Sequence, residues 1–282
     1  MAGFTTIREI RKLDKEVPIT LITREPGYSY SKPMLSTALA SNKNAEQLIS
    51  MSAEGMADQL NDLAIGSYEV DVIDLAPQIL GRLLPPEASQ ALQDKLSEAG
   101  IRWHLGTTVQ SLDKTDEGLA ITLANGKVVI SDVFLSAVGL KPRLALAQKA
   151  GIQTGLGIQV GRTLETNIQN IFSIGDCAEV EGLVLPYIMP IMQAARALAP
   201  NLLGQETMLT YPAMPVMVKT PALPTIVSPP PASAIGQWKI NSIDGGIEAR
   251  FESPDGKLLG IALLGGATAQ RAALTKELPP LL

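Results

Sequence analysis

Two carboxylates that follow apolar runs are the side chains of this sequence best placed for chemistry. Asp176 follows the run 171–174 in the stretch TNIQNIFSIGD, and Asp74 lies at the end of EVDVIDL. Both runs have the composition of interior strands of a parallel sheet. Ligands of such sheets bind beyond the carboxyl ends of the strands, where a carboxylate can accept hydrogen bonds from sugar or ribityl hydroxyls. Each aspartate could equally cap the turn that follows its strand, because Asp is common in turns.

Few other side chains could carry catalysis alone. The chain has one cysteine, Cys177, and one histidine, His104, which excludes an internal disulfide and a clustered-histidine metal site. A serine triad would have to use His104, which lies in a strand-like run, and we interpret His104 and Arg82 as structural. If the chain is an enzyme, we therefore expect a cofactor to carry its chemistry.

Composition narrows the partners and the compartment. A net charge of −5 argues against a nucleic-acid surface. No apolar run approaches the roughly 20 residues that a membrane-spanning helix needs, and residues 1–14 lack the apolar core of a signal peptide. The single cysteine favours a reducing compartment. We therefore expect a cytoplasmic protein without nucleic-acid or membrane partners.

The elements that must position the two aspartates alternate along the chain. Helical patterns occupy residues 4–13, 87–99, 190–203 and 267–278. Strand-like runs occupy residues 18–23, 69–75, 101–105, 133–138 and 157–160, and residues 236–264 are β-rich. Asn125-Gly126 between two β-rich runs predicts a hairpin. This order predicts an α/β fold whose parallel sheets are interrupted by insertions.

Several motifs carry a family resemblance. The stretch T-x-x-x-x-I-F-S-I-G-D at 166–176 resembles the second flavin-binding motif of FAD oxidoreductases with two dinucleotide-binding domains. SAVGLKPR at 136–143 resembles the segment that joins their nicotinamide domain back to the flavin domain. Four further stretches resemble one branch of this class, the rubredoxin–NAD reductases. They are YSYSKPMLS at 28–36, GDCAEV at 175–180, MPVMVKTPA at 214–222 and TKELP at 275–279. Cys177 alone agrees with this branch, because many relatives instead carry a redox cysteine pair.

The resemblance covers nearly the whole chain and implies its organisation. It implies interrupted, three-layer Rossmann-like FAD- and NAD(P)-binding domains with a small C-terminal α+β domain. The expected parts are 1–61 (first part of the FAD domain), 62–135 (partial NAD domain), 136–205 (second part of the FAD domain) and 206–282 (C-terminal domain of the rubredoxin-reductase type). The implied activity is electron transfer from NADH through FAD to rubredoxin, a small iron–sulfur protein.

The resemblance also implies contacts to the flavin ring and its side chain. Asp176 would bind the ribityl chain, and the backbone of Ile188 would contact the pyrimidine end of the flavin. A helix N-terminus at that end stabilises negative charge on the reduced ring by about 0.3–2 kcal/mol. Lys32 and Lys219 would lie near the isoalloxazine, where a cation raises the electron affinity of the flavin. Each lysine could instead be an ordinary exposed side chain.

Three further residues are implied at the nucleotide ends of the cofactors. Thr23 and Arg24 end the strand that, in this family, reaches the adenosine ribose of FAD. Asp74 would accept a hydrogen bond from the 2′-hydroxyl of the NAD ribose. It would also repel a 2′-phosphate, which favours NADH over NADPH.

The first of the two glycine-rich fingerprints of the family is incomplete. G-x-G-x-x-G on a strand-to-helix turn offers backbone N–H groups to a pyrophosphate. Ala2-Gly3 resemble its last two positions, but its strand and earlier glycines do not occur in the sequence. Met1 could therefore be an internal methionine of a longer protein.

The second fingerprint is missing as well. It should lie about 20 residues before Asp74, where the sequence offers Gly55 alone. Near Asn61-Asp62 the sequence passes directly from the early part of the flavin domain to the helix that precedes EVDVIDL. We expect a domain-sized piece of the family to be absent at this point. TGLGIQVG at 154–161 precedes a strand, and LLGGATAQ at 263–270 lacks the third glycine, so we interpret both as structural.

These gaps leave an alternative function open. A pyrophosphate without its N–H cradle loses several charge-assisted hydrogen bonds, each worth about 1.5–3 kcal/mol. We therefore predict that FAD binding is much weakened or lost and that NADH binding is weaker still. The chain could then be a catalytically impaired fragment of such a reductase, without stable FAD or NAD binding.

Overall fold

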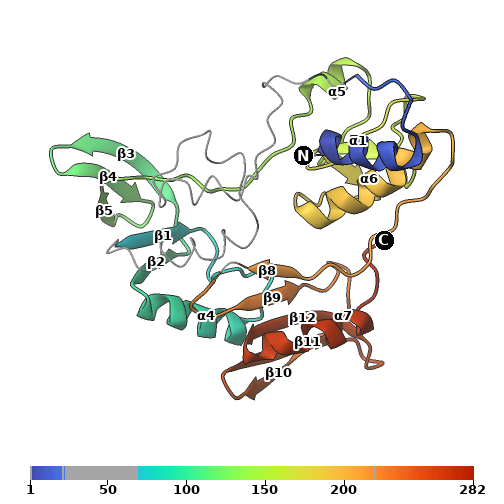
Figure 1. Ribbon diagram of the computed structural model, residues 1–282. Helices are drawn as coiled ribbons and strands as arrows, with labels where there is room; N and C mark the ends of the chain where they lie inside the picture. The colour runs from blue at the N-terminus through green and yellow to red at the C-terminus, as the bar shows by residue number, and fades with distance from the viewer. Residues whose placement is uncertain (1, 21, 23–68, 219) are drawn as a thin grey trace. The chain divides into compact units, whose positions relative to one another are not determined.

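The computed structural model describes residues 2–20, 22, 69–218 and 220–282 (Figure 1). These residues form two compact units. Unit 1 contains the described residues of 1–29, 138–214 and 280–282, and unit 2 contains those of 30–137 and 215–279. Each unit has a buried apolar core of its own.

Unit 1 is built on three helices and a short parallel strand pair. The helices are α1 (Ala2–Leu13), α5 (Ala145–Lys149) and α6 (Ile188–Leu202), and the strands are β6 (Ile158–Val160) and β7 (Ala178–Val180). Helix α1 packs along α6 (Figure 1), and β6 pairs in parallel with β7. The helices predicted at 4–13 and 190–203 are confirmed by α1 and α6.

The core of unit 1 draws on residues far apart in the sequence. Leu164, Val180, Leu198 and Tyr211 are among its buried members. The last residues of the chain pack against this core, where the backbone N–H of Leu281 donates to the carbonyl of Tyr211 at 2.8 Å and the Tyr211 N–H donates to the carbonyl of Leu282 at 3.0 Å. Unit 1 therefore needs the final residues to close.

Unit 2 begins with a strand–helix–strand element. Strands β1 (Val70–Asp74) and β2 (Ile101–Leu105) pair in parallel, and α4 (Pro86–Glu98) connects them. Proline suits the first position of α4 because its missing N–H would have no helical partner. Gly100 follows the end of the helix with φ +96°, a conformation that favours glycine. The predicted elements at 69–75, 87–99 and 101–105 are confirmed.

A three-stranded antiparallel sheet follows. Its strands are β3 (Val109–Thr115), β4 (Gly118–Leu123) and β5 (Val128–Ser131). Asn125-Gly126 connects β4 to β5, with Gly126 at φ +86°, which confirms the predicted hairpin. Ile121, Leu123 and Val129 form its buried apolar face, and Ile73 of β1 packs against them.

The rest of unit 2 is a five-stranded antiparallel sheet in the order β10-β11-β12-β9-β8. The strands are β8 (Val216–Val218), β9 (Thr225–Ser228), β10 (Gln237–Ile243), β11 (Gly246–Glu252) and β12 (Leu258–Gly265), followed by the 3-10 helix η2 (Gly266–Gln270) and α7 (Arg271–Glu277). Ala88 and Leu92 of α4 share one buried cluster with Val227, Ala249 and Ala262 of this sheet.

The strand predicted at 133–138 is wrong. These residues form no strand, and the side chains of Val133 and Leu135 are exposed. In the common strand order of a nucleotide-binding sheet, 3-2-1-4-5-6, the fourth strand pairs with the first. Asp74 marks β1 as the second strand by its expected distance from a fingerprint. The first strand of such a sheet leads into the fingerprint, and the sequence lacks both. Residues 133–138 therefore have the composition of the fourth strand, but the first strand, with which they would pair, is missing.

Two more strand predictions fail. Residues 171–174 form only an isolated bridge between Phe172 and Glu165, and Ile171 is exposed, because the described residues offer this run no parallel neighbour. Of the strand predicted at 18–23, residues 18–20 and 22 are not in a strand and Ile22 is exposed, while residues 21 and 23 lie outside the described part.

Candidate functional site

A tight turn and the start of a helix meet in unit 1. Asp176 is half-buried in the turn that leads into β7, where the N–H of Ala178 donates to the carbonyl of Gly175 at 3.0 Å. Gly175 has φ +90°, and a Cβ added there would lie 3.1 Å from the Cβ of Ala2, in the first turn of α1. The N-terminus of α1 thus approaches the turn about as closely as glycine allows.

The start of α6 lies at the same place. Gly175, Pro190 and Ile191 line one apolar cavity of about 10 Å³, which has room for one water molecule at most. Tyr187 precedes Ile188, the first residue of α6, and its side chain does not cap the helix. The space between the turn and the start of α6 is therefore filled by side chains, and a large ligand would have to bind on the surface outside this cavity.

The electrostatics of both helix starts favour negative charge. Neither α1 nor α6 has an acidic residue in its first turn, so no carboxylate of the first turn opposes the dipole of either helix. Burial raises the pKa of Tyr211 to about 12, with the neighbouring Tyr187 adding to the rise, and burial also raises the pKa of Tyr187. Both phenols are therefore neutral at pH 7 and add no negative charge.

This arrangement fits a flavin dinucleotide. The small residues Ala2-Gly3 at the start of α1 leave room for a pyrophosphate at the helix N-terminus, and Asp176 follows Gly175, the residue that Ala2 approaches. Ile188, at the start of α6, adds a second electropositive end. The other four residues that the resemblance implies at FAD, Thr23, Arg24, Lys32 and Lys219, lie outside the described residues.

Asp74 lies at the carboxyl end of β1 and is exposed. One of its carboxylate oxygens, Oδ1, accepts the N–H of Ala76 at 2.9 Å, and its carbonyl accepts the N–H of Thr107 at 3.2 Å. The first contact is the turn cap that an aspartate at a strand end can make. Asp74 Oδ2 has no partner among the described residues, so the same side chain fits a ribose hydroxyl as well.

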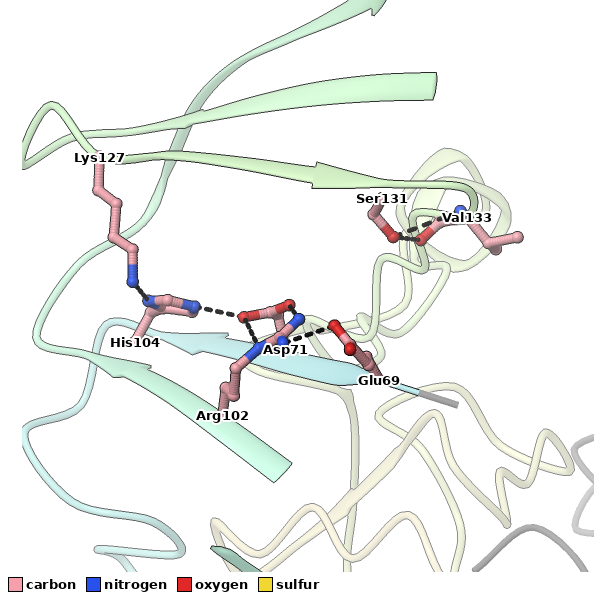
Figure 2. Close-up of polar contacts among 7 residues, drawn as sticks. All are labelled: Glu69, Asp71, Arg102, His104, Lys127, Ser131 and Val133. Atoms are coloured by element: carbon pink, nitrogen blue, oxygen red, sulfur yellow. Dashed lines mark hydrogen bonds and ion pairs between the residues drawn. The ribbon is translucent and has the colours of Figure 1, made fainter. Parts of the chain in front are cut away.

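A charged cluster on β1 and β2 was not predicted from the sequence (Figure 2). Asp71 accepts hydrogen bonds from Arg102 at 2.6 and 3.2 Å and from His104 Nε2 at 2.7 Å. Arg102 also donates to Glu69 at 2.6 Å, and Lys127 Nζ donates to His104 Nδ1 at 3.3 Å. The hydrogen bonds, from Arg102 first and then from His104, lower the pKa of Asp71 below its usual value.

His104 lies between a donor and an acceptor. The Lys127 ammonium can only donate, so Nδ1 accepts from it, and Nε2 donates to the Asp71 carboxylate. Both ring nitrogens are therefore satisfied, which agrees with the interpretation of His104 as structural. Asp71 lies directly opposite Arg102 in the β1–β2 register, and that register was the signal that could have revealed the cluster.

Both secondary glycine-rich stretches are structural, as interpreted from the sequence. The N–H of Gly157 donates to the carboxylate of Glu179 at 2.8 Å, so a negative charge already occupies the loop at 154–161. Gly265 has φ +58°, and a Cβ there would lie 2.1 Å from the carbonyl oxygen of Gly245. The second stretch is therefore needed for close backbone packing.

Known families match both halves of the chain. Residues 53–199 match the pyridine nucleotide-disulphide oxidoreductase family, and residues 208–278 match the rubredoxin binding C-terminal domain. The fold is shared with a ferredoxin reductase from Rhodopseudomonas palustris, with a TM-score of 0.81 at 20% identity over 99% of this chain and 93% of that one. The family match, which covers just over half of the chain, and the shared fold place the chain among the pyridine nucleotide-disulphide oxidoreductases, with the α/β fold that was predicted.

The particular family follows from closer relatives. The chain is 33% identical to the rubredoxin-NAD(+) reductase of Alcanivorax borkumensis over 100% of its own length and 97% of that protein. It is 35% identical to the rubredoxin-NAD(+) reductase of Acinetobacter baylyi over 100% of its length and 96% of that protein. The chain belongs to the rubredoxin-NAD(+) reductase family, whose cofactors are FAD and NADH.

The same comparison reveals an internal gap. The alignment with the Alcanivorax protein extends over 371 residues whereas the chain has 282, so 89 aligned positions have no residue of this chain opposite them. The relative is therefore longer than this chain by internal positions, which is in line with the expected absence of a domain-sized piece near Asn61-Asp62, and the place of that piece stays a prediction. Among the described helices, none has the length and apolar character to cross a membrane.

Proposed function

We propose that this chain is an NADH-dependent reductase that holds FAD and passes electrons to rubredoxin. The meeting of the α1 N-terminus, the Gly175-Asp176 turn and the α6 N-terminus carries the proposal, because these are the elements that an anionic, hydroxyl-rich dinucleotide requires. When bound, FAD accepts a two-electron hydride from NADH and releases electrons singly.

The chain's own residues would bind and orient the cofactors. Asp176 accepts hydrogen bonds from the ribityl hydroxyls, and the backbone at Ile188 contacts the pyrimidine end of the flavin. Asp74 accepts the ribose hydroxyl of NADH through the oxygen that does not cap the turn. Residues 208–278, which match the rubredoxin binding domain, present the surface to rubredoxin.

Four further roles come from the family resemblance. We assign Lys32 and Lys219 to the surroundings of the isoalloxazine, and Thr23 and Arg24 to the adenosine ribose. The single cysteine of the chain supports a reducing compartment, so we propose that the reductase acts in the cytoplasm.

Flavin titration of the purified protein tests the assignment of Asp176. A chain that holds FAD as proposed turns yellow on titration despite its incomplete fingerprints, and Asp176→Ala should then weaken FAD binding by about tenfold or more, since hydrogen bonds to a charged group are worth about 1.5–3 kcal/mol. Glu206→Ala, an exposed acid of the same unit, is the matched control and should bind FAD normally. Unchanged FAD affinity in Asp176→Ala would contradict the role of that residue.

The internal gap favours a second candidate function. A chain that has no residue at 89 positions of this alignment, and whose sequence contains neither complete fingerprint, could be an impaired fragment without stable FAD or NAD binding. A protein that stays colourless after incubation with FAD and gel filtration would support this candidate. Rubredoxin-dependent oxidation of NADH with added FAD would exclude it, and capture of rubredoxin without flavin would identify a binding module.

A further inference from the structure

An apolar segment of unit 2, residues 133–137, has the composition of a buried strand, yet only Phe134 packs against the core, beside the β3–β5 sheet, and its neighbours Val133 and Leu135 face solvent. Val133 is 77% exposed and Leu135 is 83% exposed. The hydroxyl of Ser131 donates to the carbonyl of Val133 at 2.9 Å and accepts its N–H at 3.4 Å, which ends β5 and starts the segment. In Figure 2 the side chain of Val133 points away from the charged cluster. Residues 134–137 donate no backbone hydrogen bond within the described part of the chain.

The same unit offers an open strand edge. Strand β1 pairs only with β2 among the described residues, and none of these residues pairs with its other edge. Val70, at the start of β1, is exposed. The segment VFLSA at 133–137 carries no charge, so Asp71 and Asp74 would meet no like charge if it lay along β1.

The segment at 133–137 of a second copy is a suitable occupant for this edge of β1. The strand that should separate β1 from residues 133–137 belongs to the fingerprint region that the sequence lacks. Within one chain the segment and the edge do not pair. Two copies can satisfy each other with two identical contacts, because each copy carries one segment and one edge.

We propose that residues 133–137 of one copy pair as a β-strand with the free edge of β1 in a second copy, in a reciprocal homodimer. The exchange gives the unpaired backbone groups of both elements partners and removes the exposed valine and leucine from water. Because each contact is used twice, the assembly closes at two chains.

Sedimentation velocity of the full chain over a wide concentration range tests the proposal. We expect a monomer–dimer equilibrium, and the double variant Val133→Ser, Leu135→Ser should raise the dimer dissociation constant by about tenfold or more. Ile235→Ser is the matched control, because Ile235 is 79% exposed in the same unit but outside the segment. Its dimer should be unchanged.

Two further measurements keep the test decisive. Ser136→Pro removes an N–H that strand pairing needs and should also weaken the dimer, while the circular dichroism of the monomer stays the same. Amide hydrogen exchange in β1 should slow as the dimer forms. A monomer at every concentration, open-ended assemblies, or a dimer equally sensitive to Ile235→Ser would overturn the proposal.

Discussion

Removing the Asp71 carboxylate should destabilise unit 2 more than any other single loss of charge in the cluster. Asp71→Ala leaves His104, which is 9% exposed, with a buried N–H that has no acceptor. An unsatisfied buried donor costs about 1–3 kcal/mol. The side chain of Arg102 is 52% exposed and can exchange its contact for water, so that pair adds little. We expect a loss of about 2 kcal/mol in the free energy of unfolding.

Tryptophan fluorescence during urea unfolding measures this loss selectively. The chain has two tryptophans, Trp103 on β2 and Trp238 on β10, and both lie in unit 2. Glu69→Ala is the control, because Glu69 contacts the same Arg102 from an exposed position and should change the stability little. An Asp71→Ala midpoint that coincides with that of Glu69→Ala would refute the reasoning.

The pH dependence of the same measurement gives an independent check. Asp71 has a lower pKa in the folded protein than in the unfolded chain, because Arg102 and His104 donate hydrogen bonds to it. Its contribution is therefore complete above the unfolded value of about 3.9 and is lost as the pH falls through the folded value. The stability difference between wild type and Asp71→Ala should shrink below about pH 4. A constant difference down to acid unfolding would contradict this.

The remaining predictions concern a close approach and an orphaned hydroxyl. Gly175→Ala should speed amide exchange in α1 more than Gly182→Ala does, because both glycines have positive φ (+90° and +79°) but only at Gly175 would the new Cβ meet Ala2; equal effects would mean that backbone strain, about 1–2 kcal/mol, explains both. Thr107→Val should leave unit 2 as stable or make it up to about 1 kcal/mol more stable in urea, because the buried Thr107 hydroxyl has no partner among the described residues; a clear loss of stability would show that the hydroxyl is satisfied.

Elements with strong local signals could be predicted from the sequence. Gly100 ends α4, Asn125-Gly126 turns the hairpin, and Pro190 lies in the first turn of α6. Each signal depends on the backbone conformation that one or two residues prefer, so it does not depend on which other segments pack nearby.

Strands inside a parallel sheet could not be predicted in the same way. Residues 133–138 and β1 have similar apolar composition, yet in the part of the chain that the structure describes only β1 has a neighbouring strand to pair with. Composition shows that a run would be stable inside a sheet, but not that the neighbouring strand exists. The prediction at 171–174 failed for the same reason.

The candidate sites show a similar division. Asp176 was found because it closes a motif, but its closeness to Ala2 joins residues at opposite ends of unit 1 and required the fold. The pairing of Asp71 with His104 depends on a strand register that the sequence does not encode locally. The domain boundaries and the roles of the seven predicted site residues stay predictions.

The return of Leu281 and Leu282 to Tyr211 has a consequence for how the protein is made. Unit 1 joins α1, near the start of the chain, to these final leucines, whereas the described parts of unit 2 lie wholly between them. The core of unit 1 therefore cannot close until residues 280–282 have been made, and α1 waits for them through nearly the whole of synthesis. Unit 1 should fold slowly, because contacts between residues so distant in sequence carry a high loop-closure entropy.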